Sequence, residues 1–75
     1  MNRKGALKKL NGLMPRVEVH LEKLRTAPES QDVPHWCAEL ESWLRQMEEL
    51  LPVLGRKTSR EWGGRIERWR QELES

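Results

Sequence analysis

A chain of 75 residues is long enough for one small domain, and its single cysteine excludes an internal disulfide. It contains no apolar run long enough for a membrane span or a signal-peptide core, so we expect a cytoplasmic protein without a membrane partner. The formal net charge is +2, and it is unevenly distributed. Residues 1–25 hold seven Lys or Arg and two Glu, residues 26–54 hold one Arg and six acidic residues, and residues 55–75 hold six Lys or Arg and four Glu. If these segments are packed helices, the acidic middle segment is expected to pair its charges with those of the two basic segments.

The first predicted helix covers about residues 4–26. Its apolar residues recur at alternating steps of three and four: Leu7, Leu10, Met14, Val17, Leu21 and Leu24. Pro15 interrupts this helix chemically, because it cannot donate to the carbonyl four residues back. Either one helix kinks there or a short helix precedes a longer one. We favour a single kinked helix, because the apolar spacing continues unchanged past Pro15.

The second predicted helix covers about residues 33–54, after a polar connection over residues 26–32. Asp32 is a plausible N-cap, and Pro34 is tolerated in a first turn. The apolar stripe of this segment is the widest in the chain: Val33, Trp36, Cys37, Leu40, Trp43, Leu44, Met47, Leu50, Leu51 and Leu54. A stripe of this width suits a helix with two neighbours, so we expect it to be the central helix.

The third predicted helix covers about residues 58–74. Gly55 is a typical helix stop, and Thr58 with Glu61 three residues later matches a capping box. The apolar seam is narrow: Trp62, Ile66, Trp69 and Leu73. Gly63 and Gly64 weaken the second turn, so we expect either fraying there or a close backbone approach that compensates.

The four tryptophans, in a chain without Phe or Tyr, form two pairs seven residues apart. A turn centred near Pro52 would place Trp36 opposite Trp69, whereas a turn centred near Arg56 would place Trp43 opposite Trp69. The position of Gly55 and the Thr58 cap favour the second register. In that register Trp36 and Trp62 are expected to stay partly exposed, and they are our candidate partner-binding residues.

The sequence gives little reason to expect catalysis. His35 and Cys37 lie two residues apart, which points them to different sides of a helix and makes shared metal coordination awkward. A nucleophilic pair of Cys37 and His20 would lack an orienting group. Arginines lie four residues from glutamates at Glu61 and Arg65 and again at Arg68 and Glu72, a spacing typical of surface ion pairs. We therefore predict no catalytic residue, no metal, no cofactor and no small-molecule substrate.

These observations predict an all-α fold, an up-down-up bundle of three helices with antiparallel neighbours. The function we favour is a non-catalytic protein-protein interaction module with an apolar, Trp-containing helix face: a small subunit, an adaptor, an inhibitor or a homodimer. The reason is that a core this small rarely suffices alone, and a disulfide is excluded. The alternative is a small DNA- or RNA-binding regulatory protein. Its contacts would come from the basic N-terminus and from Arg56, Lys57, Arg60, Arg65 and Arg68.

Overall fold

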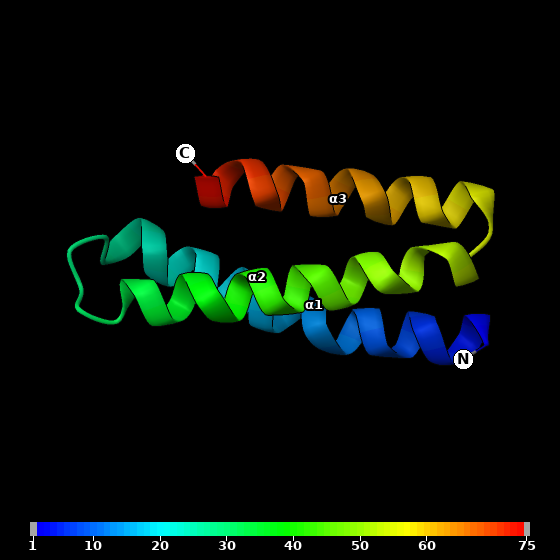
Figure 1. Cartoon of the computed structure of the whole chain (residues 1–75), viewed down its shortest axis with the longest axis horizontal. Helices are drawn as coiled ribbons and strands as arrows, with labels where there is room; N and C mark the ends of the chain where they lie inside the picture. The colour runs from blue at the N-terminus through cyan, green and yellow to red at the C-terminus, as the bar shows by residue number, and fades with distance from the viewer. Residues whose placement is uncertain (1, 75) are drawn as a thin grey trace.

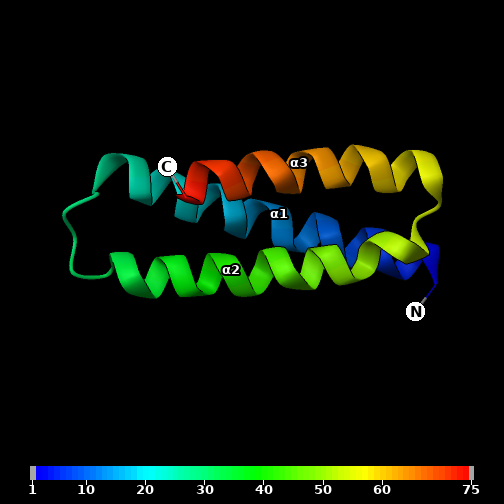
Figure 2. The same cartoon turned by 45° about the horizontal axis from the view of Figure 1, so that its top comes forward.

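The computed structural model describes residues 2–74 as three helices, α1 (Arg3–Thr26), α2 (Val33–Leu50) and α3 (Arg56–Glu74). A single 3₁₀ turn, η1 (Leu51–Val53), follows α2. Helices α1 and α3 run in one direction and α2 runs in the other, and α2 packs against both (Figures 1 and 2). The predicted all-α, up-down-up three-helix bundle with a central α2 is therefore confirmed. The bundle is elongated, with a longest extent of 40 Å.

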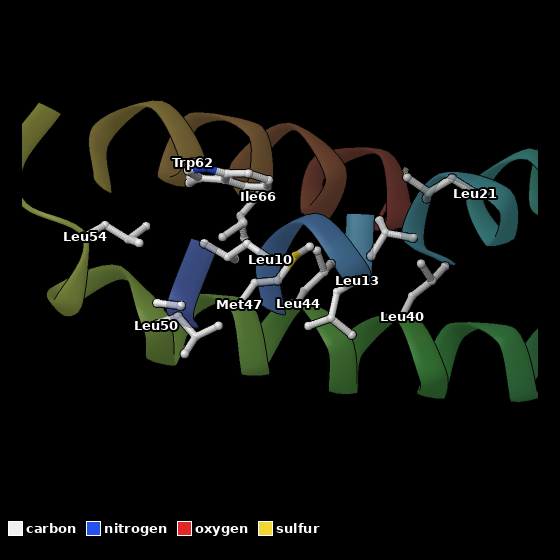
Figure 3. Packing of buried hydrophobic residues seen from close by; sticks show 12 residues of the cluster. Leu10, Leu13, Leu21, Leu40, Leu44, Met47, Leu50, Leu54, Trp62 and Ile66 are labelled. Atoms are coloured by element: carbon white, nitrogen blue, oxygen red, sulfur yellow. The ribbon is translucent and has the colours of Figure 1, made fainter. Parts of the chain in front are cut away.

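The core is a continuous row of apolar side chains between the helices (Figure 3). Its members come from the apolar positions spaced three and four apart: Ala6, Leu10, Leu13, Val17, Leu21, Leu40, Leu44, Met47, Leu50, Leu54, Trp62 and Ile66. Seven of the largest, among them Leu10, Leu40 and Leu44, have less than 2% of their surface exposed. Burial of these side chains is the main stabilising contribution in a bundle of this size.

Helix α1 continues through Pro15 without a break. The single-helix alternative is therefore correct and the split-helix alternative is wrong. Pro15 removes the amide that would bind the carbonyl of Asn11, and both residues are exposed, so water can satisfy that carbonyl. The helix begins at Arg3 because the Asn2 side chain accepts a hydrogen bond from the amide of Gly5 at 2.8 Å.

Two of the predicted caps behave differently from expectation. Asp32 stands at the N-cap position of α2, but its side chain makes no capping hydrogen bond. Helix α3 begins two residues earlier than predicted, since the amide of Ser59 already donates to the carbonyl of Gly55 at 2.9 Å. The predicted capping box is therefore wrong: Thr58 lies inside the helix, and its hydroxyl accepts a hydrogen bond from Arg3 of α1 at 3.1 Å. The side chain joins two helices instead of closing one.

The turn between α2 and α3 is centred later in the chain than Pro52, as predicted by the register that places Trp43 opposite Trp69. The predicted end of the second helix at residue 54 is wrong, because α2 ends at Leu50 and the chain continues as the 3₁₀ turn that contains Pro52. Gly55, with a positive φ of 84°, then redirects the chain into α3. Arg70 of α3 binds Glu48 of α2, and the position of a Cβ on Gly63 lies 3.8 Å from the Leu51 side chain. A turn centred near Pro52 would bring neither pair together. The 3.8 Å separation is ordinary contact and α3 is continuous, so neither of the two expectations for the glycine pair is met.

Candidate functional site

The two tryptophans predicted to stay partly exposed have different surroundings. Trp36 is half-buried, and the ammonium of Lys23 lies 5.7 Å from the centre of its ring. Trp62 is only 7% exposed, so the prediction of a partly exposed indole is wrong at this position. It packs in the core, and the guanidinium of Arg65 covers its ring at 4.8 Å. A buried and covered indole offers little surface to a partner.

The other pair, Trp43 and Trp69, packs against α1 from two different helices. The ring of Trp43 meets His20 edge-to-face, with 4.7 Å between ring centres and 87° between the planes. Trp69 is half-buried and lies on the side of the bundle where α1 and α3 face each other. Among the described residues no ring contact joins Trp43 to Trp69, although the predicted register brings them level. The sequence did not predict Trp69 as a partly exposed indole, because helical spacing alone does not show how far two helices stand apart.

A hollow of about 450 Å³ lies over Trp69 between α1 and α3, and we call it the Trp69 hollow. It is lined by Met14 and Glu18 of α1 and by Arg65, Arg68, Trp69 and Glu72 of α3. The apolar groups in its lining are an indole and a thioether, and the guanidinium of Arg65 donates to that sulfur at 3.6 Å. Its two rims carry opposite charges, Glu18 on one side and the two arginines on the other. Such a hollow can take an apolar side chain flanked by one basic and one acidic group.

An ion pair closes one end of this hollow. Arg25 of α1 donates to Glu72 of α3, and it also binds Glu22 at 2.9 Å. The guanidinium lowers the pKa of the Glu72 carboxyl from its ordinary value, because the hydrogen bond favours the charged form. The pair therefore ties the C-terminal parts of α1 and α3 together.

Beyond this ion pair lies a second, more apolar hollow of about 390 Å³, which we call the end notch. It is lined by Leu21, Leu24, Arg25, Pro28, Val33, Cys37, Glu72 and Leu73. The notch exists because α3 stops short of the connection between α1 and α2, which extends past it (Figure 2). Cys37, a free and half-buried thiol, lines this notch.

The two histidines meet one carboxylate. Glu39 of α2 lies 2.5 Å from His35 one turn before it and 3.6 Å from His20 of α1. The other ring nitrogen of His20 is 3.1 Å from the carbonyl of Arg16, which fixes the ring in place. Among residues 2–74 no three His, Cys, Asp or Glu side chains are arranged to hold a metal ion. The cluster links α1 to α2 through side chains of which the sequence pattern gave no hint.

Three of the five basic residues of the alternative prediction share one end of the bundle with the basic N-terminus. Arg56, Lys57 and Arg60 occupy the first turns of α3 and are exposed, as are Arg65 and Arg68 further along. The hydrogen bond from Arg3 to Thr58 brings the start of α1 against the start of α3. Two basic clusters that are 50 residues apart in sequence thus become neighbours in space.

The bundle is electrically polarised along its length. The half built from residues 2–17 and 43–66 holds ten Lys or Arg and three Glu, which gives a formal net charge of +7. The half built from residues 18–42 and 67–74 holds four Lys or Arg and nine acidic residues, which gives −5. Charge matching between helices is present as well, since Arg70 of α3 binds Glu48 of α2. Most of the difference in net charge between the two ends of the bundle nevertheless remains.

Two further findings bear on function. None of the helices described over residues 2–74 has the length and apolar character needed to cross a membrane. In comparisons with known proteins, no family model matches the chain, and no curated protein or solved structure matches it.

Proposed function

We propose that this protein is a non-catalytic protein-interaction module of the cytoplasm, and that the Trp69 hollow is where it engages a partner. The observation that carries the proposal is the placement of a half-buried indole, beside the Met14 thioether, in the lining of an open hollow. Indoles in hollows bounded by charged side chains are typical anchors of protein interfaces.

The occupant that fits best is a helix of a partner protein. An apolar side chain of that helix would cover Trp69. A basic residue on one side would face Glu18, and an acidic residue on the other would face Arg65 and Arg68. The opposite signs of the two rims fix the direction in which such a helix can lie across the hollow.

Site-specific photo-crosslinking in the cell of origin tests this proposal. A photoreactive benzoyl-phenylalanine replaces Arg68 at the rim of the hollow, and the matched control carries it at Lys57, which is exposed on the same helix. We expect one polypeptide to be linked from position 68, through a helical segment that bears both a basic and an acidic residue, and little linkage from position 57. Equal linkage from both positions, or none from position 68, would contradict the proposal.

A second function is favoured by a separate observation, the meeting of the two basic clusters at one end of the bundle. We propose DNA or RNA backbone binding there as the alternative, through Arg56, Lys57 and Arg60 with Arg3, Lys4 and Lys8. Phosphate contacts of this kind weaken steeply as salt rises. Binding to generic duplex DNA that persists at about 150 mM salt and is lost in a Lys57→Glu, Arg60→Glu variant would favour this function over the first.

A further inference from the structure

The outer face of α1 is complementary to itself. Six exposed residues follow one line along this helix at steps of four, three, four, three and four: Lys4, Lys8, Asn11, Pro15, Glu18 and Glu22. Steps of three and four keep these residues on one side of a helix, about 120° around it from the core residues Leu10, Val17 and Leu21, and Glu18 and Glu22 border the groove toward α3. We call this line the outer stripe. No other helix of the bundle covers it, since all six residues are exposed.

The charges along the outer stripe are arranged symmetrically about its midpoint, with positive charges on one side and negative charges on the other. Two lysines precede its midpoint and two glutamates follow it at equal distances, and the midpoint falls at the level of Leu13. When a second α1 is laid antiparallel with its two-fold axis at this level, Lys4 faces Glu22 of the second copy. In the same arrangement Lys8 faces Glu18, and Asn11 faces Pro15. The two-fold axis repeats each pair, so four ion pairs of opposite charge form.

Val19 adds an apolar contact to this arrangement. It is the one large apolar side chain in the described part of the chain that is mainly exposed, at 53%. It flanks Glu18 on the outer face, at the level where Lys8 of a second copy would lie. The aliphatic stem of Lys8 would cover it while the ammonium reaches Glu18. The electrical polarisation of the whole bundle acts in the same sense, because an antiparallel copy places each positive half beside a negative half.

From these observations we propose that the outer stripe of α1 is a self-association surface, and that its partner is a second copy of this chain packed antiparallel about a two-fold axis at Leu13. Glu18 belongs both to this surface and to one rim of the Trp69 hollow, so the variant at Lys4 and Lys8, which lie outside that hollow, separates the two interactions. Because exposed ion pairs are weak and are screened by salt, the dimer is expected to form at high protein concentration and low ionic strength.

Two charge-reversed variants test the surface. The first, Lys4→Glu with Lys8→Glu, makes the outer stripe wholly acidic, and the second, Glu18→Lys with Glu22→Lys, makes it wholly basic. Each variant alone is expected to raise the dissociation constant of the dimer by at least about tenfold, since four attractive pairs become repulsive. An equimolar mixture of the two is expected to restore association as a heterodimer, because every facing pair is again opposite in sign.

The controls change the net charge equally at other exposed positions. Lys57→Glu with Arg60→Glu on α3 matches the first variant, and Glu41→Lys with Glu49→Lys on α2 matches the second. Both controls are expected to keep the dissociation constant of the unmodified chain to within about threefold. Circular dichroism establishes that each variant remains helical. Sedimentation equilibrium at low salt, up to about millimolar protein, gives the constants.

The antiparallel direction has its own measurement. With Cys37 replaced by Ala, spin labels on Asn11→Cys should lie close together in the dimer. Labels on Lys4→Cys should be separated by about 27 Å along the helix, from a rise of 1.5 Å per residue. A parallel dimer would give similar distances for both labels. The proposal is overturned by a monomer over the whole concentration range, by a mixture that fails to associate, or by equal label distances.

Discussion

The ring of His20 on α1 contacts the ring of Trp43 on α2 edge-to-face, with 4.7 Å between the ring centres, and this contact joins the two helices. The imidazole side chain is 15% exposed, and its two nitrogens point to Glu39 and to the carbonyl of Arg16. A polar ring thus occupies a position at the margin of an apolar core, with a neighbour for each of its nitrogens. Its contribution to stability can be separated from that of the nearby, exposed His35.

Replacement of His20 by Ala is expected to lower the free energy of unfolding by about 1 to 2 kcal/mol, because the ring contact and the packing around it are both lost. Urea denaturation followed by tryptophan fluorescence measures the change. The matched control is His35→Ala, whose side chain is 72% exposed and should cost less than about 0.5 kcal/mol. Equal effects at the two positions would show that the contact with Trp43 adds nothing.

Truncation of Leu44, which is fully buried on the central helix, should be far more damaging. Leu44→Ala is expected to lower the free energy of unfolding by about 2 to 5 kcal/mol through lost burial and the cavity left behind. In a bundle this small, such a loss would leave a large fraction of molecules unfolded at 37 °C. Val19→Ala serves as the control at dilute protein, where a change within about 0.5 kcal/mol is expected. Thermal unfolding by circular dichroism distinguishes the two.

Replacement of Pro15 by Ala should stabilise the protein. The substitution restores an amide donor to the interior of α1, which is expected to raise the free energy of unfolding by about 1 to 3 kcal/mol. Pro34 lies in the first turn of α2, where no helical hydrogen bond is missing, so Pro34→Ala should be neutral or slightly destabilising. A melting temperature that falls in Pro15→Ala would indicate that the proline is required where it stands.

Replacement of two glycines by alanine should change the free energy of unfolding in opposite directions. Gly64 lies inside α3 with nothing within 4 Å of an added Cβ, so Gly64→Ala should stabilise the protein by about 1 kcal/mol. Gly55 has a φ of 84°, which side chains disfavour, so Gly55→Ala should destabilise it by about 1 kcal/mol. Both values come from denaturant titration of the single variants. The same sign at both positions would contradict the α2–α3 turn described above.

Glu72 should make stability depend on pH in the acid range. Arg25 lowers its pKa in the folded state below the ordinary value of 4.5, so the pair stabilises the fold above that pH. The stabilisation is lost as the pH falls through the lowered pKa, where the folded carboxylate takes up its proton. Glu72→Gln should remove this part of the dependence, and the effect should be under about 1 kcal/mol because the pair is partly exposed. Denaturation at pH 7 and pH 3, with Glu74→Gln as control, measures it.

The apolar spacing was sufficient to predict the helices and most of the core. Residues such as Leu10, Leu40 and Ile66 recur every three or four positions, and only a helix turns such a pattern into one continuous apolar side. The helix α2 ends at Leu50 and not at the predicted residue 54, although the turn at Gly55 was predictable, because glycine is the residue best able to adopt a positive φ. The start of α3 was not, since Thr58 had a second possible partner in Arg3, which only the packed bundle brings near.

The sequence by itself thus determined the class of fold, the central position of α2 and the symmetric order of charges on α1. These are local properties, set by spacing along a single helix. Tertiary structure alone decided that Trp62 is covered and Trp69 left at a hollow, because exposure depends on how far α1 and α3 stand apart. It also decided that three blocks of charge become two oppositely charged ends, since antiparallel packing brings the start of α1 beside the start of α3.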